Sequence, residues 1–223
     1  MFDHISPTYD KLNHILSLNI DKSWRRKAVR MIAVRQPKEV LDIACGTGDF
    51  SIALAKAGVP KVRGIDISEG MMKVGRTKIE EQGLADRICF QQEDSEAMTF
   101  ADGTFDAVSV SFGIRNFEHR ERGLQEMYRV LRPGGMLLVL ELSVPRNRML
   151  RGLYKLYFLH ILPAVGKLIS RDPAAYKYLP ASVLNFPQPE TFCRMMRDAG
   201  FVQVESRALT FGLCRIFTGI RNA

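Results

Sequence analysis

Residues 40–49 read Val-Leu-Asp-Ile-Ala-Cys-Gly-Thr-Gly-Asp. The first four are apolar apart from Asp42 and predict a buried strand, and the residues after them predict a turn that opens a helix. Gly46 and Gly48 would let the backbone of this turn approach a ligand closely. The start of the helix would present backbone N–H groups to an anion. The stretch therefore predicts a strand, a ligand-binding turn and a helix in succession, although such a turn can also serve tight packing alone.

Short apolar runs alternate with amphipathic stretches along most of the chain. They predict strands at 40–43, 61–65, 88–91, 105–111 and 136–142, and helices at 50–57, 68–82 and 120–131. This alternation is typical of βαβ units around a parallel sheet. A helix at 190–199 precedes strands at 201–206 and 213–220, which can pair as an antiparallel hairpin. We expect one α/β domain over 1–223, with an N-terminal helical cap at 1–36 and a substrate-side insertion at 146–187.

The composition narrows the class of partner. The 223 residues carry a formal net charge of +8, which predicts nucleic acid, an acidic membrane surface or an anionic cofactor. The four cysteines are scattered, without a CxxC pair, so we expect reduced thiols in a cytosol and no metal site. No apolar run approaches the roughly 20 residues that span a bilayer, and no secretion signal is recognisable. We therefore expect a cytoplasmic protein.

The residues around the glycine turn indicate the ligand. Asp66 ends the second predicted strand, where a carboxylate accepts both hydroxyls of a ribose. A dinucleotide site would have glycine or alanine where this chain has Ser51, so NAD is disfavoured. Asp42 suits the ammonium group of an amino-acid ligand, and Asp94 suits the exocyclic amine of adenine unless it caps a helix. With the terminal hairpin, these features indicate S-adenosylmethionine, bound by Asp42, Gly46, Thr47, Gly48, Asp66, Asp94 and Ser95.

Five segments carry a family resemblance over essentially the whole chain. They are FDHI with YDKLN at 2–13, LDIACGTGD at 41–49, FGIRN at 112–116, RVLRPGG at 129–135 and YKYLP at 176–180. With these segments the chain resembles the ubiquinone/menaquinone biosynthesis C-methyltransferase family, although it has Leu12, Asn19 and Ala44 where Met, Gly and Gly are usual. The resemblance implies a class I S-adenosylmethionine-dependent methyltransferase fold, which is Rossmann-like with a seven-stranded, mostly parallel sheet.

The resemblance also implies a reaction. A methyl group would pass from S-adenosylmethionine to a ring carbon of demethylmenaquinol, the last step of menaquinone biosynthesis, or of a ubiquinone-pathway benzoquinol. Arg115 would stabilise the quinolate or orient an activating water, since a guanidinium is not deprotonated, and Asn116 would hold the same oxygen or water. Without the resemblance, an ion pair between Arg115 and an acid such as Glu118 is the simpler interpretation. By the same resemblance, Ser111 lines the cofactor pocket.

The substrate side is expected in the cap and the insertion. Five side chains would position the substrate, although each also suits a helix cap or a core: Tyr9, Asp10, Asn13, Tyr176 and Tyr178. Along 149–169 an apolar, aromatic stretch has one basic face made by Arg148, Arg151 and Lys155. Such a helix suits the anionic inner face of the cell membrane and a polyprenyl tail, or a core helix with a solvated edge. The expected partner is a polyprenylated demethylquinol, and a homodimer is left open.

Two other functions are weighed against this one. A nucleic-acid methyltransferase that acts on base amines would carry an Asn/Asp-Pro-Pro-aromatic tetrad after the fourth strand, where this chain reads Ser-Phe-Gly-Ile at 111–114. The basic residues are also dispersed, so we expect no nucleic-acid partner. The second alternative is a catalytically silent subunit that binds S-adenosylmethionine, and the intact pair of Arg115 and Asn116 argues against it.

Overall fold

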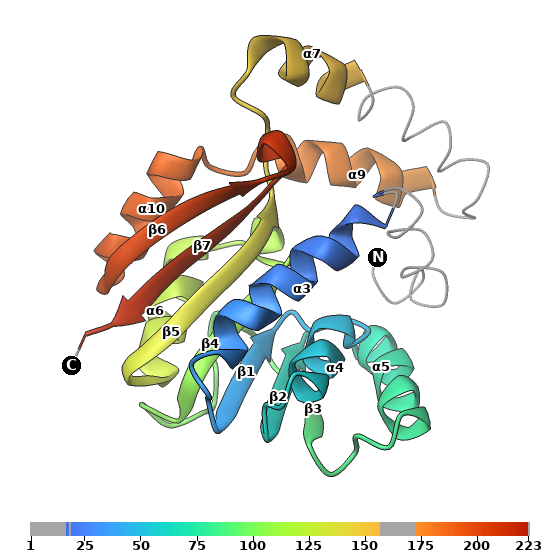
Figure 1. Cartoon of the computed structure of the whole chain (residues 1–223), viewed down its shortest axis with the longest axis vertical. Helices are drawn as coiled ribbons and strands as arrows, with labels where there is room; N and C mark the ends of the chain where they lie inside the picture. The colour runs from blue at the N-terminus through green and yellow to red at the C-terminus, as the bar shows by residue number, and fades with distance from the viewer. Residues whose placement is uncertain (1–16, 18, 157–172, 223) are drawn as a thin grey trace.

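One sheet with the strand order β3-β2-β1-β4-β5-β7-β6 organises the computed structural model, which describes residues 17, 19–156 and 173–222 (Figure 1). Strands β1 to β5 are parallel, β7 is antiparallel to β5, and β6 is antiparallel to β7. The predicted sheet with its terminal hairpin is therefore confirmed. The strands are β1 Glu39–Ile43, β2 Lys61–Asp66, β3 Ile88–Gln92, β4 Phe105–Ser111, β5 Leu131–Leu142, β6 Phe201–Leu209 and β7 Cys214–Arg221.

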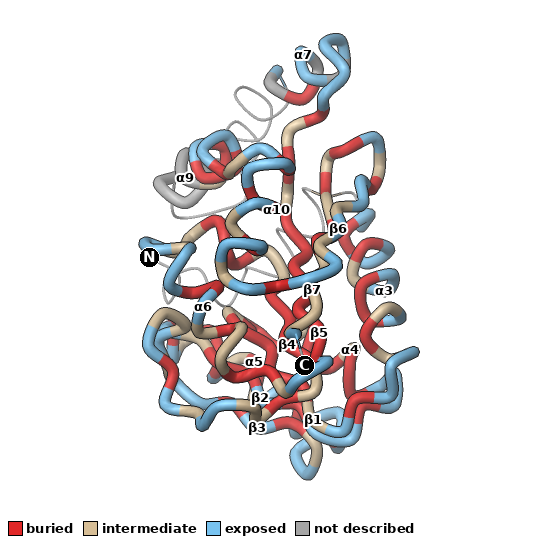
Figure 2. The backbone as a smooth tube through the Cα atoms, turned by 90° about the vertical axis from the view of Figure 1, so that its left-hand side faces the viewer, coloured by how far each residue is buried: buried red, intermediate tan, exposed pale blue. Residues whose placement is uncertain are grey.

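Helices cover both faces of this sheet. In chain order they are α3 Ile20–Ala33, α4 Asp49–Lys56, α5 Glu69–Glu81, α6 Arg120–Val130, α7 Arg148–Leu156, α9 Pro173–Leu184 and α10 Pro189–Asp198, with short 3₁₀ helices η1 Ile114–Asn116 and η3 Thr210–Gly212. Alternate residues of the central strands face opposite layers. Leu138 packs into a cluster with α3, α4 and α5, whereas Leu137 packs into a cluster with α6 and α10. Because both faces are covered, the central strands are mostly apolar, and Figure 2 shows that they are buried along most of their length.

Strand β5 begins earlier than predicted. The sequence indicated a start at 136, after the Pro-Gly-Gly turn, but β5 already includes Leu131. Leu131 pairs with Phe105 and Met136 pairs with Ala107, so four residues bulge opposite one. Arg132 Nη1 donates to Asp106 Oδ1 over 2.6 Å and ties this bulge to β4. The turn is thus an irregularity inside a strand, because pairing with β4 continues on both sides of it.

The predicted cap and insertion are described in part. Helix α3 lies within 1–36 and buries Trp24, Ala28, Val29 and Ile32 against the sheet. Helices α7 and α9 lie within 146–187, and residues 157–172 lie outside the described residues. The division of the domain therefore stays a prediction. Within the described residues, no helix has both the length and the hydrophobicity needed to cross a bilayer, and no group of three His, Cys, Asp or Glu side chains is placed to share a metal ion.

Candidate functional site

The glycine turn leaves β1 at the carboxyl edge of the sheet. Three of its residues have left-handed backbones: Ala44 with φ 53°, Gly46 with φ 52° and Gly48 with φ 80°. Cys45 N donates to the carbonyl of Ile65 over 3.0 Å, which fastens the turn to β2. Ala44 is the residue that replaces the usual glycine, and it adopts the conformation that glycine would adopt at lower energy. The turn is thus held open at the edge where parallel sheets bind their ligands.

Phe90 of β3 supports the turn from below. A Cβ at Gly48 would lie 2.7 Å from its ring, and a Cβ at Gly64 or Gly75 would lie 2.5 Å from it. The ring of Phe90 thus fits only because glycine, with no Cβ, stands at three positions, in the turn, in β2 and in α5. This contact was not predicted from the sequence, although a glycine inside a strand is a signal of close approach.

Asp66 ends β2 beside the turn, as predicted. Its Oδ2 accepts a hydrogen bond from Gly46 N and its Oδ1 accepts one from Ser68 N, both over 2.9 Å. Ser68 in turn caps α5 by accepting from Met71 N. These bonds fix the orientation of the carboxylate at the carboxyl edge of the sheet, where a ribose hydroxyl could donate to it.

Asp42 lies deeper than a ligand-binding acid would. The residue is fully buried, its Oδ2 accepts from Ser51 Oγ over 2.6 Å and its Oδ1 accepts from Ser109 Oγ over 2.9 Å. Burial raises the pKa of Asp42 to about 6, against the two serine hydrogen bonds, which lower it. The bonds join α4, β1 and β4 beneath the turn, so the geometry supports an anchoring role. Ammonium binding by Asp42 stays a prediction.

Arg115 is buried in the loop after β4. Its Nη1 donates to Glu141 Oε1 over 2.8 Å and also to the carbonyl of Phe112. Glu141, fully buried at the end of β5, also accepts from the backbone N of Arg115 and of Leu142. From the sequence, an acid such as Glu118 was the expected partner in such a pair. Glu141 takes that place because β5 lies next to β4 in the sheet, a neighbour that sequence distance hides.

The other predicted cofactor residues surround the same edge. Asp94 and Ser95 follow β3, where Asp94 Oδ1 accepts from Glu96 N over 2.8 Å, so this side chain does cap a local turn. Thr47 is buried within the glycine turn. Ser111 Oγ is buried at the end of β4, with no hydrogen-bond partner in the part of the chain that the structure describes.

The substrate-side predictions are only partly placed. Tyr9, Asp10 and Asn13 lie outside the described residues. Tyr176 and Tyr178 belong to α9, whose backbone lies against η1, the helical turn that carries Arg115; their side chains lie outside the described part. Asn116 ends η1, and its backbone N donates to the carbonyl of Gly113 over 3.0 Å. The fold thus brings α9 to the catalytic candidates, and the roles of the five side chains stay predictions.

A cofactor with an adenosine and an amino-acid portion fits these residues. Ser111 Oγ, which is buried without a hydrogen-bond partner among the described residues, could bind a polar atom of such a cofactor. Among the described residues, only Met71 Cε lies within 4 Å of a Cβ built on Gly46, at 3.4 Å, so a ligand can approach the backbone there. Ile67, missed by the sequence analysis, is 67% exposed directly after Asp66 and offers an apolar surface to a purine ring. Its position after a strand-end acid was the available signal.

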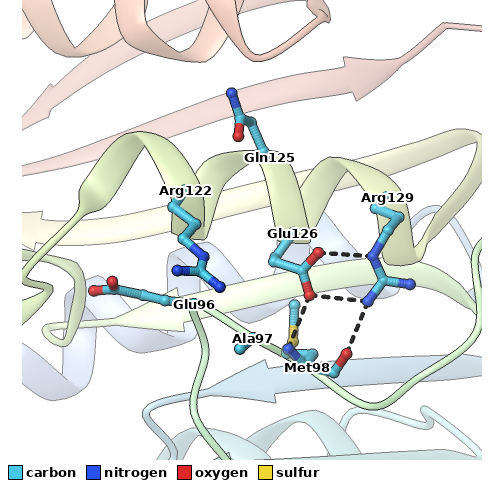
Figure 3. A pocket seen from close by; sticks show the side chains of 7 residues that line it. All are labelled: Glu96, Ala97, Met98, Arg122, Gln125, Glu126 and Arg129. Atoms are coloured by element: carbon cyan, nitrogen blue, oxygen red, sulfur yellow. Dashed lines mark hydrogen bonds and ion pairs between the residues drawn. The ribbon is translucent and has the colours of Figure 1, made fainter.

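A separate cavity of about 470 Å³ lies beside α6 and contains none of the predicted site residues; its lining is Glu96, Ala97, Met98, Arg122, Gln125, Glu126 and Arg129 (Figure 3). Arg129 Nε donates to Glu126 over 2.7 Å, and its other nitrogens donate to the carbonyls of Met98 and Phe100. The hydrogen bond from Arg129 lowers the pKa of Glu126. Because this arginine is bound on several sides, its network fastens the 96–102 loop to α6.

Comparisons with known proteins identify the family of the chain. The model of the ubiE/COQ5 methyltransferase family matches residues 1–221. The demethylmenaquinone methyltransferase of Bacteroides fragilis is 47% identical over 222 residues, covering 99% of this chain and 91% of that protein. The ubiquinone/menaquinone biosynthesis C-methyltransferase UbiE of Geobacter sulfurreducens is 46% identical over 221 residues, covering 98% of this chain and 86% of that protein.

A solved structure shares the fold. It is phosphoethanolamine N-methyltransferase 2 of Haemonchus contortus in complex with S-adenosyl-L-methionine, with a TM-score of 0.65, 16% identity, and coverage of 87% of this chain and 52% of that one. At this identity the likeness concerns the fold alone, whereas the near-complete sequence matches decide the family. The chain belongs to the ubiE/COQ5 methyltransferase family.

Proposed function

We propose that the chain transfers a methyl group from S-adenosylmethionine to a ring carbon of demethylmenaquinol, with a ubiquinone-pathway benzoquinol as the alternative substrate. The names of the relatives support this reaction. The observation that carries it is the contact between two loops. A Cβ on Gly113 would collide with the Cβ of Ala44, so the loop that holds Arg115 and Asn116 touches the glycine turn. Catalytic candidates and cofactor candidates therefore share one site.

In this proposal, one group of residues binds the cofactor and another activates the substrate. The cofactor supplies an electrophilic methyl group when it is bound. Asp66, Ser111 and the glycine turn would hold the cofactor, since in-line transfer requires accurate alignment more than acid–base strength. Arg115 stays protonated and would stabilise the quinolate oxygen that makes the ring carbon nucleophilic. Glu141 holds the guanidinium in place from the buried side.

A labelled-methyl assay tests the reaction. The protein is incubated with S-adenosylmethionine carrying a labelled methyl group and with reduced demethylmenaquinone, a demethoxy-benzoquinol or RNA. We expect label on the naphthoquinol ring. Label only on the benzoquinol would select the alternative substrate, and label only in RNA would overturn the proposal.

To test the catalytic role of Arg115, a variant is required that does not leave an unpaired charge in the interior. Removing one partner of a buried ion pair costs about 3–5 kcal/mol, whereas replacing both partners is often nearly neutral. We therefore expect the double variant Arg115→Gln/Glu141→Gln to keep its fold and to lose methyl transfer by on the order of 100-fold or more. Full activity in this folded double variant would show that the pair is structural.

Membrane contact through α7 is a further part of the proposal. Met149 is 72% exposed and Arg148 is exposed beside it. Arg151 donates to the carbonyls of Pro145 and Arg146, so this arginine stabilises the start of α7. Arg148→Glu should weaken co-sedimentation with phosphatidylglycerol vesicles, whereas Arg26→Glu, on the exposed side of α3, should not. Equal sedimentation of both variants would refute membrane contact through α7. The homodimer stays a prediction.

A further inference from the structure

The sheet order sets the direction in which the cofactor would lie. Asp94 follows β3 and Asp66 follows β2, and both are assigned to the adenosine half. The next strands in the sheet are β1 and β4. An extended ligand with its adenine over β3 must therefore place its amino-acid end over the glycine turn and the loop after β4.

One cation from the cap helix lies between these two loops. Arg25 of α3 donates from Nη1 to Asp49 Oδ2 over 3.0 Å, and Asp49 directly follows Gly48. The guanidinium carbon of Arg25 also lies 5.6 Å from the ring centre of Phe112, the residue after Ser111. Burial raises the pKa of Asp42 beneath the turn, and the charge of Arg25 acts against that rise. Arg25 thus contacts both loops that would border the amino-acid end.

The hydrogen bonds that the guanidinium of Arg25 makes within the described residues all leave from Nη1. Its Nη1 binds Asp21 and Asp49, each over 3.0 Å, and Asp21 is fixed by Ser17 Oγ over 2.5 Å. From Nε and Nη2 there is no hydrogen bond to any residue within 17, 19–156 and 173–222. An arginine fork with an available edge is suited to a carboxylate, and the pairing on its other side reduces the entropy that binding would cost.

Asp49 does not depend on Arg25 as its only cationic partner. Lys78 Nζ binds the other oxygen of Asp49 over 2.5 Å. The carboxylate of Asp49 would therefore keep a cationic partner if Arg25 also bound a ligand. The side chain of Arg25 is 15% exposed, so a charge-assisted bond there would be only weakly screened by solvent.

We propose that Arg25 binds the α-carboxylate at the amino-acid end of the cofactor. The proposal rests on the cofactor placement under the proposed function and adds a residue from outside the glycine turn. Arg25 would select ligands with an amino-acid portion over adenosine thioethers that lack one. Helix α3 would thereby contact the cofactor directly. It also packs against the loop after β4, where the ring centres of Trp24 and Phe112 lie 6.3 Å apart.

Calorimetric binding to the full chain tests this role without any turnover. Two ligands are compared: S-adenosylhomocysteine, and 5′-methylthioadenosine, which keeps the adenosine and the sulfur but has no carboxylate. Arg25→Gln should weaken S-adenosylhomocysteine binding by about 10- to 100-fold, the loss expected for one charge-assisted hydrogen-bonded contact. Its affinity for 5′-methylthioadenosine should be unchanged. Arg26→Gln, one residue along α3 and exposed, is the matched control and should change neither affinity.

The outcomes separate this proposal from the cofactor placement itself. Equal weakening of both ligands in Arg25→Gln would show that Arg25 only supports the loops, and unchanged binding of both would also overturn the proposal. Asp66→Ala should weaken both ligands, and its failure to do so would show instead that the cofactor placement is wrong. If Arg25→Gln does not fold, the neutral variant Arg25→Met gives the same comparison. A smaller preference for S-adenosylhomocysteine over 5′-methylthioadenosine than in the wild type supports carboxylate binding, and an unchanged preference refutes it.

Discussion

Replacing Gly113 by alanine should destabilise the chain through a single contact. The new Cβ would lie well under 3.0 Å from the Cβ of Ala44, whereas carbon atoms pack at about 3.5–4.0 Å. Neither atom can rotate away, because a Cβ position is set by the backbone. Overpacking of this kind costs about 1–3 kcal/mol, and we expect the upper end, because both loops are fastened by backbone hydrogen bonds.

A second substitution should reverse the effect. Ala44→Gly removes the opposing Cβ and also relieves a left-handed backbone with φ 53°. That relief, about 1–2 kcal/mol, is largely offset by the greater freedom of glycine in the unfolded chain, about 0.5–1 kcal/mol. Ala44→Gly alone should therefore be nearly neutral, and Ala44→Gly/Gly113→Ala should be nearly as stable as the starting protein. The coupling free energy between the two positions should be about 2–3 kcal/mol.

Urea unfolding followed by tryptophan fluorescence measures these differences. The chain has one tryptophan, Trp24, which packs against Phe112 beside Gly113. Gly152→Ala is the control, since a Cβ there meets no atom within 4 Å. A loss below about 1 kcal/mol in Gly113→Ala, or no recovery in the double variant, would refute the steric reasoning.

Three further predictions concern residues outside this contact. Because the folded pKa of Asp42 is about 6 against an ordinary 3.8, its protonated form stabilises the fold at acidic pH, and this stability is lost as pH rises through that window. The free energy of unfolding of the wild type minus that of Asp42→Asn should thus fall by about 2.5 kcal/mol between pH 4 and pH 7; a constant difference in urea titrations would contradict this. Trp24→Phe loses the bond from Nε1 to Thr210 Oγ1 and should cost about 1 kcal/mol in thermal unfolding followed by circular dichroism. Arg129→Met should cost about 3 kcal/mol while Arg122→Met, across the same cavity, stays neutral; equal effects in urea unfolding would show that the Arg129 network is not structural.

The elements of the fold were largely predictable because they depend on local pattern. The apolar run before Ala44 and the glycines after it predicted β1 and its turn, and Ser68 was recognised as the start of α5. The start of β5 was wrong, since Pro133-Gly134-Gly135 normally ends regular structure. In the folded chain, pairing of Leu131 with Phe105 retains the earlier part of the strand. Local residue preferences are overruled there by a neighbour 26 positions away.

The candidate site shows the same division. Residue types and spacing were enough to indicate the glycine turn and Asp66, whereas the FGIRN loop was indicated by the family resemblance. Only the tertiary structure decided that Arg115 pairs with Glu141, that Asp42 binds two serines, and that Arg25 contacts both Asp49 and Phe112. Burial and ion pairing depend on which strands and helices become neighbours. The sequence determines the chemistry of each side chain. Which charged groups form ion pairs depends on the sheet order and the helix packing, because these decide which side chains become neighbours.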